Sequence, residues 1–225
     1  MQNFDLYLEP TYFIDSHHPA IVEKAHELVN NIESEVDRIK ALFYYVRDSY
    51  YYSPYHVVFN PYKLKASTIL TRTGVKKGYC IEKAVLFAAL CRVINVPNRL
   101  IFCNVRNHIA TDNVEKVLGT DLMVFHGYNE VFVSGKWVKC TVAFNKSLCD
   151  KLNVAALEFD EEKDQVFQEF DKEGGKFMVY ENEYGTFHDV PYDLWVSETK
   201  RLYPHLFKEG GNEEFLLMAQ KHALK

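Results

Sequence analysis

One segment constrains the fold of this chain more than any other: residues 80 to 94 are apolar around most of the circumference of a helix. At helical spacing, one apolar face is formed by Ile81, Ala84, Val85, Ala88 and Ala89. Neighbouring apolar residues widen this face: Phe87, Cys91 and Ile94. A helix with so little polar surface has no side to present to water, so it lies inside the protein. We predict a buried central helix that begins near Cys80 and is ended by Asn95 and Pro97.

The residues before this helix show further helical patterns. Residues 1 to 18 are expected to be an extended or irregular lead-in, and residues 19 to 50 have apolar residues at helical spacing with an interruption at Asn30-Asn31. Ser34 is typical of an N-cap, so we expect a second helix to begin after it. "YYYSPYHVVFNPYKLK" predicts a long loop or edge segment, "KASTIL" a short helix and "TRTGVKKGY" a loop.

Strands dominate the part of the chain after the central helix. "NRLIFCNVR" predicts a strand, residues 107 to 120 a polar loop with a turn at Gly119, and "LMVFHGYNEVFVSGKWVKCTVAF" a hairpin that turns at Ser134-Gly135. "EFDEEKDQVFQEFDKEGGK" is acidic and expected to be exposed, and "NEEFLLMAQKHALK" to be a helix. We predict one α+β domain over residues 1–225, with a core at roughly 35–145 and a C-terminal extension at 146–225.

Composition narrows the classes of function. Hydrophobic residues make up 48% of the 225 residues, which is enough for a sizeable core, and the net charge of -5 argues against nucleic acid as a partner. The chain has no apolar run long enough for a membrane span and no secretory signal at "MQNFDLYLEP", so we expect a cytoplasmic protein. No metal-ligand spacing and no phosphate-binding loop is present, so we expect no metal and no cofactor. Oligomeric state stays open.

The five cysteines are an odd number without CxxC spacing, which favours free thiols. Cys80 stands behind a Gly-Tyr step at the start of the central helix, where unsatisfied N–H groups are expected to lower a thiol pKa. Cys91 and Cys103 fall inside apolar elements and are expected to be core residues. From position alone, Cys80 is either a small buried hydrophobe or a reactive thiol.

A thiol nucleophile needs a base, normally histidine, and His126 is the one histidine inside a well-marked strand pattern. A hairpin turning at Ser134-Gly135 places His126 opposite Ala143 and Tyr128 opposite Thr141. His126 and Thr141 then share one face, on which the Thr141 hydroxyl could orient the imidazole. Cys140 points to the opposite face, as a core residue. His108 follows a strand and is expected in a surface loop.

Two ordered motifs carry a resemblance to a known family. "GYCIEKAVLFAALCRVINVPNR" resembles the nucleophile segment of the transglutaminase-like superfamily, and "HGYNEVFVSGKWVKCTVAF" is similar to its second signature. The matching positions are Cys80, Arg92, Val96, Pro97, Arg99, His126, Tyr128, Glu130, Val131, Gly135 and Trp137. The resemblance covers roughly residues 35 to 145 and implies a papain-like α+β core, with N-terminal helices and a central buried helix packed on an antiparallel sheet.

The resemblance also implies a cysteine-nucleophile enzyme that forms a thioester with an amide acyl group, with Cys80 as nucleophile and His126 as base. It favours a peptidase or amidase over an acyltransferase, and a peptide or protein amide as substrate. The family usually carries aspartate where this chain has Thr141, and threonine supplies no charge to the imidazole. Asn145 is a substitute for this third residue, and Tyr52 is a candidate second oxyanion donor.

Two other interpretations remain at this point. One is a non-catalytic binding module on the same fold, which the threonine at position 141 favours. The other is that Cys80 and His126 are ordinary core residues.

Overall fold

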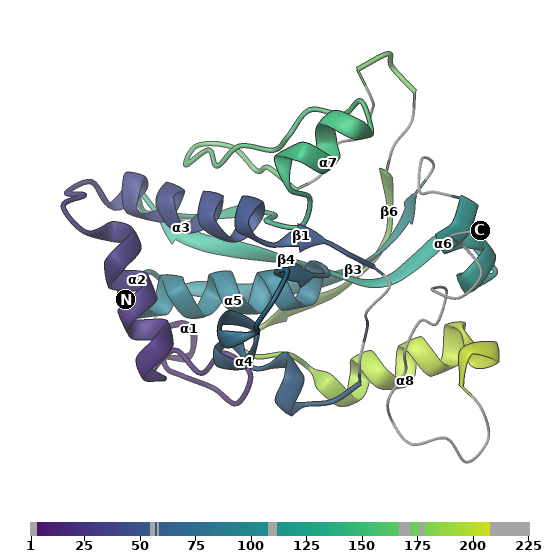
Figure 1. Ribbon diagram of the computed structural model, residues 1–225, viewed down its shortest axis with the longest axis horizontal. Helices are drawn as coiled ribbons and strands as arrows, with labels where there is room; N and C mark the ends of the chain where they lie inside the picture. The colour runs from purple at the N-terminus through teal and green to yellow at the C-terminus, as the bar shows by residue number, and fades with distance from the viewer. Residues whose placement is uncertain are drawn as a thin grey trace.

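A computed structural model describes residues 4–54, 57, 59–107, 112–166, 172–175 and 178–207 of the chain. Helices α2 to α5 form a layer on one face of an antiparallel sheet, with α5 between the outer helices and the sheet (Figure 1). On the other face, Cys149 of α7 packs in a second cluster with Ile101 and Cys103. The elements are α1 (Asp5–Leu8), α2 (Pro19–Val29), α3 (Glu35–Ser49), β1 (Tyr51–Tyr52), η1 (Tyr62–Leu64), α4 (Ala66–Thr71), β2 (Lys77–Gly78), α5 (Cys80–Val93), β3 (Asn98–Asn107), α6 (Asp112–Leu118), β4 (Leu122–Val133), β5 (Lys136–Cys140), α7 (Lys146–Lys151), β6 (Met178–Phe187), α8 (Tyr192–Leu202) and η2 (Pro204–Leu206).

The predicted central helix is confirmed. Every residue of α5 from Cys80 to Arg92 is buried, because α2, α3 and α4 pack on one side and β3 and β4 on the other. The helix ends where the sequence places its stop, and Asn95 adopts a positive φ of 61° just after it. The mixed architecture of helices on an antiparallel sheet is the predicted α+β class.

The N-terminal helices also follow the prediction. α2 ends at Val29, and α3 begins after Ser34, whose Oγ accepts a hydrogen bond from the Asp37 N–H at 3.3 Å. Arg92, one of the matching motif positions, is buried in α5 and donates to the backbone carbonyls of Glu9, Asn98 and His188. This arginine therefore ties the lead-in and the segment before α8 to the core.

The four-stranded sheet has the order β5-β4-β3-β6, and all its pairs are antiparallel. The turn is confirmed, since Ser134 and Gly135 both have positive φ (52° and 82°), as a two-residue hairpin turn requires. The predicted register holds from Val133–Lys136 to Asn129–Cys140.

The hairpin is shorter than predicted. β5 ends at Cys140, so the expected pairs Tyr128–Thr141 and His126–Ala143 are not formed. The physical reason is a competing partner: the Thr141 N–H donates to the Gln165 carbonyl, and Gln165 forms a bridge with Cys140. The chain after Cys140 therefore leaves β4, while His126 pairs with Cys103 of β3.

Other predictions need correction in detail. The segment predicted as a polar loop at 107–120 contains α6, whose residues Val117 and Leu118 pack against the core. The lead-in contains the short helix α1, and residues 51–52 and 77–78 form a small parallel pair. Gly119 has the expected turn conformation, with φ of 70°. The predicted helix at 212–225 and His108 lie outside the described residues.

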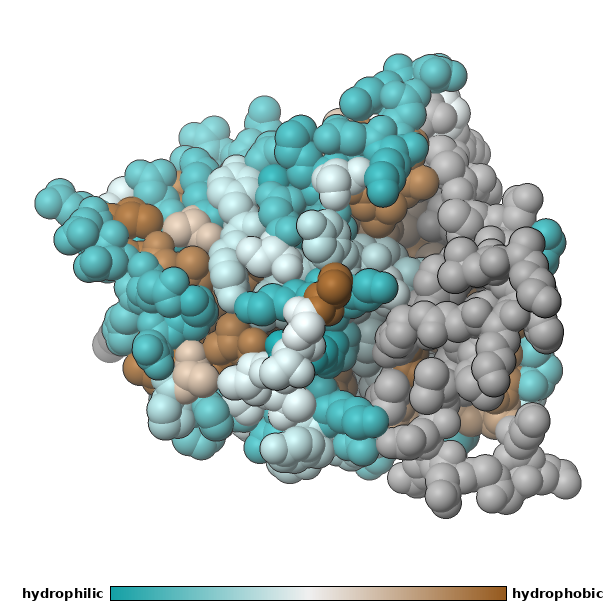
Figure 2. All heavy atoms as spheres, viewed as in Figure 1, coloured by the Kyte–Doolittle hydropathy of each residue, from teal (hydrophilic) through white to brown (hydrophobic). Residues whose placement is uncertain are grey.

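The C-terminal extension contributes to the same sheet, since β6 pairs with β3 along its length. The face of the molecule in Figure 2 is largely hydrophilic, with apolar residues in small separate patches. None of the helices in the described part of the chain has the length and apolar character that a bilayer crossing requires.

Candidate functional site around Cys80

Cys80 is the first residue of α5 and is buried. The first turn is fixed by Glu82, which accepts the Tyr79 N–H at 3.3 Å and an Arg72 guanidinium N–H at 2.6 Å. This arrangement satisfies one helix-terminal donor with a carboxylate and neutralises that carboxylate with an arginine. The start of α5, and with it the thiol, is held at a defined place.

Three backbone N–H groups act on the Cys80 sulfur: those of Gly127, Ile81 and Cys80 itself. Burial raises the pKa of this thiol to about 11, and the three N–H groups lower it by less than burial raises it. The expectation of a lowered pKa at the helix N-terminus is therefore wrong for the resting protein. The loss of hydration destabilises the thiolate by more than the hydrogen bonds from these N–H groups stabilise it.

The contact with Gly127 follows from the short β5. In β4 the Phe132 N–H points to Pro97, on the β3 side, so strand alternation directs the Gly127 N–H to the β5 side. There β5 has already ended at Cys140, opposite Asn129, so this N–H is free to meet the sulfur of Cys80. The correction to the hairpin length is thus part of the site.

Gly127 has no side chain, and this allows β4 to approach the start of α5. A Cβ added at this position would lie 3.1 Å from Phe102 Cε1 and 3.4 Å from the Ile81 Cα. Close approach of two backbones is a usual reason for glycine inside a strand.

His126 directly precedes Gly127, so the amide that contacts Cys80 belongs to the peptide bond between these two residues. The imidazole is 2% exposed, and burial lowers its pKa to about 4. Its Nδ1 is buried and has no hydrogen-bond partner among the described residues. At neutral pH the imidazole is uncharged, with one nitrogen available to accept a proton.

The backbone just before His126 is strained. Phe125 is buried with a positive φ of 59°, at a bulge where the β3–β4 register shifts between Cys103 and Val105. Such a conformation costs on the order of 1–3 kcal/mol for a non-glycine residue. The Phe125 N–H donates to Asn104 Oδ1 at 3.2 Å, and this hydrogen bond holds the bulge. No local pattern indicates this bulge, because it depends on the pairing of two strands.

Thr141 and Asn145 have other partners in this structure. The Thr141 Oγ accepts the Ala143 N–H at 3.3 Å, and among the described residues no hydrogen bond joins it to His126. Asn145 accepts the Tyr52 N–H through Oδ1 at 2.9 Å and donates through Nδ2 to Ser147 Oγ at 2.7 Å. Asn145 thus joins β1 to the start of α7.

A buried lysine, Lys83, lies about one helical turn after Cys80. The Lys83 Nζ donates to the carbonyls of Arg47, Tyr50 and Ala143 at 2.7–2.8 Å. Burial lowers the pKa of this lysine to about 7, and Asp48 opposes the shift. The side chain fastens the end of α3 and the segment after β5 to α5. In the sequence it looks like one polar residue on a helix, and nothing there marks its three acceptors.

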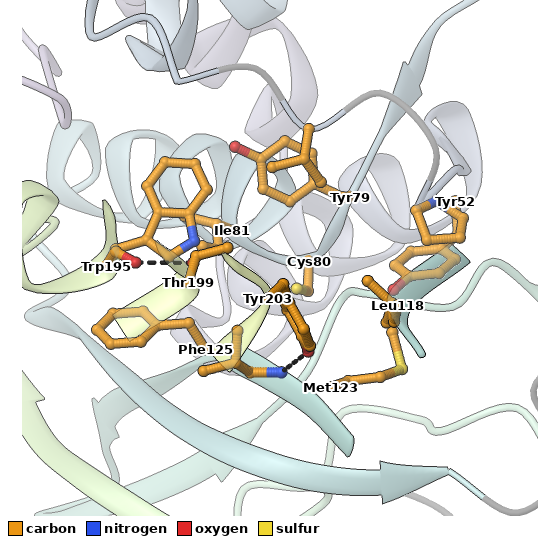
Figure 3. A pocket seen from close by; sticks show the side chains of 13 residues that line it. Tyr52, Tyr79, Cys80, Ile81, Leu118, Met123, Phe125, Trp195, Thr199 and Tyr203 are labelled. Carbon is orange, nitrogen blue, oxygen red and sulfur yellow. Dashed lines mark hydrogen bonds between the residues drawn. The ribbon is translucent and has the colours of Figure 1, made fainter. Parts of the chain in front are cut away.

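Cys80 forms part of the wall of a cavity of about 80 Å³. Figure 3 shows its sulfur facing the space between Tyr203, Tyr52 and Met123. The predicted residues Cys80 and Tyr52 therefore meet at this cavity, whereas His126 does not contribute to its lining. Among the described residues, no group of three His, Cys, Asp or Glu side chains is placed to hold a metal.

Other positions of the two sequence motifs contact one another away from the cavity. Arg99 pairs with Glu130 at 2.5 Å, and its guanidinium lies 4.0 Å from the centre of the Trp137 ring. These three side chains join β3, β4 and β5 on one face of the sheet. They support the strand that carries His126 without taking part in the site itself.

Comparison with known proteins bears on the family of this chain. A family model described as "Transglutaminase-like superfamily" matches residues 22–142, more than half of the 225 residues. A solved protein from Cytophaga hutchinsonii, described as "a Putative Cysteine Protease", has 16% sequence identity and a TM-score of 0.49. The match covers 80% of this chain and 64% of that protein, so this chain spans less than two thirds of its length. The search of curated proteins finds no match.

Proposed function

The chain belongs to the transglutaminase-like superfamily, and on that premise we propose that it cleaves an amide through a cysteine thioester, with Cys80 as nucleophile and His126 as base. The observation that carries the proposal is the placement of the Cys80 sulfur: it is at the first residue of a buried helix, acted on by three backbone N–H groups and open to a cavity. Helix N-termini and backbone N–H groups favour negative charge on the atom they face.

In the first step the Cys80 sulfur attacks the amide carbonyl carbon. The thiol proton passes to Nδ1 of His126, which is buried and unpartnered in the resting protein. Because burial keeps the thiol and the imidazole neutral, we propose that the proton moves while the sulfur–carbon bond forms, as in general-base catalysis. The C–N bond then breaks, and the imidazolium returns the proton to the leaving amine.

The negative charge that develops on the carbonyl oxygen needs hydrogen-bond donors. We assign the backbone N–H of Cys80 as one donor and propose Tyr52, in the wall of the same cavity, as the second. Water then attacks the thioester carbonyl, the C–S bond breaks, and the proton of the water returns the sulfur to a thiol. Thr141 takes the place of the family's third residue. It carries no charge, so we propose that it supports the His126 region through the Ala143 N–H.

Intact-mass spectrometry with activated acyl esters tests the nucleophile and the base. We expect one acyl group on the wild-type protein, located at Cys80 by peptide mapping, and none at that position in Cys80→Ala. His126→Gln should slow acylation by about a hundredfold, the lower range for loss of a general base. Acylation that is unchanged in Cys80→Ala would remove the proposal. Amide profiling with and without a primary amine then separates hydrolysis from acyl transfer.

A second candidate is a binding module that retains the fold without turnover. It is favoured by one observation: the hydroxyl of Thr141 is bonded to the Ala143 N–H, and His126 has no charged partner among the described residues. A protein of this kind binds peptide amides at the cavity but accumulates no acyl adduct. The same mass experiment therefore distinguishes the two candidates.

A further inference from the structure

The cavity beside Cys80 has a wall that comes from outside the family-matched residues. Trp195 and Thr199 of α8, and Tyr203 directly after it, line the cavity together with Cys80. The family model ends at residue 142, so this wall belongs to the C-terminal extension of the chain. Figure 3 shows Trp195 and Thr199 to the left of Cys80, and Tyr203 below it.

The two hydroxyls of this wall are turned toward the protein. The Tyr203 hydroxyl accepts the Val124 N–H at 2.8 Å and donates to the Leu122 carbonyl at 2.6 Å. The Thr199 hydroxyl donates to the Trp195 carbonyl at 2.7 Å, within α8. These hydroxyls have intramolecular partners, so the part of each side chain offered to the cavity is chiefly carbon.

No charged side chain is present among the described residues that line the cavity. A carboxylate or ammonium group buried there would lose its water without meeting a side chain of opposite charge, which is strongly unfavourable. An aliphatic group would lose nothing of this kind and would gain from burial. The cavity therefore selects by polarity.

The volume of the cavity indicates the size of the group that fits inside it. The cavity measures about 80 Å³, roughly half of an engineered apolar cavity of about 150 Å³ that binds benzene. A short aliphatic group suits this space better than an aromatic ring.

Resting on the function proposed above, we propose that the acyl donor carries a short aliphatic group next to its reacting carbonyl, and that this group occupies the cavity formed by α8, Tyr203 and the strained end of β4. The acyl part of the substrate stays attached to the sulfur in the thioester, so it is the part that remains beside the wall containing Cys80. The C-terminal extension thereby determines specificity, while the family core supplies the nucleophile.

A matched pair of esters tests the proposal: 4-nitrophenyl butyrate and 4-nitrophenyl hemisuccinate, whose acyl groups differ by a methyl group against a carboxylate. Acylation of Cys80 is followed by intact mass and nitrophenolate release, with Cys80→Ala as the blank. We expect butyryl transfer to be about a hundredfold faster than succinyl transfer. The 4-nitrophenyl ester of phenylacetate should also react slowly, because its aromatic ring exceeds the cavity. Equal rates for butyrate and hemisuccinate would overturn the proposal.

Substitutions in α8 supply the second readout. Thr199→Leu adds bulk to the cavity wall and should slow butyryl transfer at least about tenfold while acetyl transfer is retained. Ser197→Leu is the matched control, since Ser197 is exposed on the same helix and does not line the cavity. Leu118→Phe, which narrows the cavity from α6, is the alternative if Thr199→Leu folds poorly. It should likewise slow butyryl transfer and retain acetyl transfer.

The outcomes separate the two levels of the argument. Acylation of Cys80 without preference for aliphatic groups, or identical behaviour of Thr199→Leu and Ser197→Leu, overturns the specificity proposal and leaves the nucleophile intact. Failure of every ester to acylate Cys80 overturns the proposed function itself.

Discussion

The protonation state of Cys80 gives the sharpest prediction, because the sequence and the structure disagree about it. Burial raises the pKa of this thiol to about 11 and lowers that of His126 to about 4. The resting protein then has a neutral thiol at Cys80 and a neutral imidazole at His126. A preformed thiolate–imidazolium pair, the alternative, needs charge stabilisation that the described residues around His126 do not supply.

The expected pH dependence of alkylation at Cys80 follows from the fraction of the thiol that is ionised. A thiol with a pKa of about 11 is ionised to about one part in ten thousand at pH 7, whereas an ordinary thiol near 8.5 is ionised to about 3%. Because the thiolate is the reactive form, the iodoacetamide rate at Cys80 should rise about tenfold per pH unit and about a thousandfold from pH 6 to pH 9. Limited access to the buried sulfur lowers all these rates equally and leaves the slope unchanged.

The assay is peptide mapping of alkylated Cys80 at five or six pH values, with Cys80→Ser to confirm the peptide. Circular dichroism at each pH shows that the fold is retained. A rate that is flat between pH 5 and pH 8 would refute the reasoning, since a plateau is the mark of a thiolate paired with an imidazolium. In that case the N–H groups of Gly127, Ile81 and Cys80 outweigh burial.

Three further substitutions test the structural basis of the site. Unfolded lysine keeps its proton to about pH 10.4 whereas burial lowers the folded pKa of Lys83 to about 7, so the unfolded state binds more protons between these values and stability should rise with pH there. Buried thiols with raised pKa oppose this trend above about pH 8.5 and are common to both proteins, so the measured quantity is the difference in unfolding free energy between the wild type and Lys83→Met. In urea unfolding at pH 7 and pH 9 this difference should shift in favour of the wild type by up to about 1.4 kcal/mol per pH unit, and an unchanged difference would contradict it. Gly127→Ala, whose Cβ would lie 3.1 Å from a Phe102 ring carbon, should cost about 1–3 kcal/mol and slow acylation of Cys80 at least about tenfold, and an unchanged rate would show that the Gly127 amide is dispensable. Ser34→Ala should cost about 1 kcal/mol in urea unfolding through loss of the α3 N-cap, with Cys80 acylation unaffected.

The elements that could be predicted are those whose signals are local. α5 is apolar on nearly every side, so its burial follows from its own residues. The break between α2 and α3 follows from Ser34, and the hairpin turn from Ser134-Gly135. In each case the residues that decide the structure are within a few positions of one another.

The features that escaped prediction depend on residues distant in the sequence. β5 ends at Cys140 because Gln165 takes the place of further pairing with β4. The bulge at Phe125 depends on Asn104 in the neighbouring strand, and the three acceptors of Lys83 come from separate segments. Tyr203 reaches β4 from the end of α8. No periodicity in the sequence records such contacts, because each exists only once the chain has folded.

In the reaction that we propose, these distant contacts do part of what a charged third residue would do at position 141. In an aspartate-containing triad the carboxylate stabilises the imidazolium. Here burial alone accounts for the lowered pKa of His126, and no charged group acts on it among the described residues. The protein instead directs backbone N–H groups at the sulfur, from two elements that meet only because Gly127 lacks a side chain and β5 stops short. Rate depends on how much better the transition state is stabilised than the ground state. N–H groups that face the sulfur favour the negative charge there as the thiol loses its proton, and the N–H of Cys80 is also the donor that we propose for the carbonyl oxygen, on which charge develops during attack.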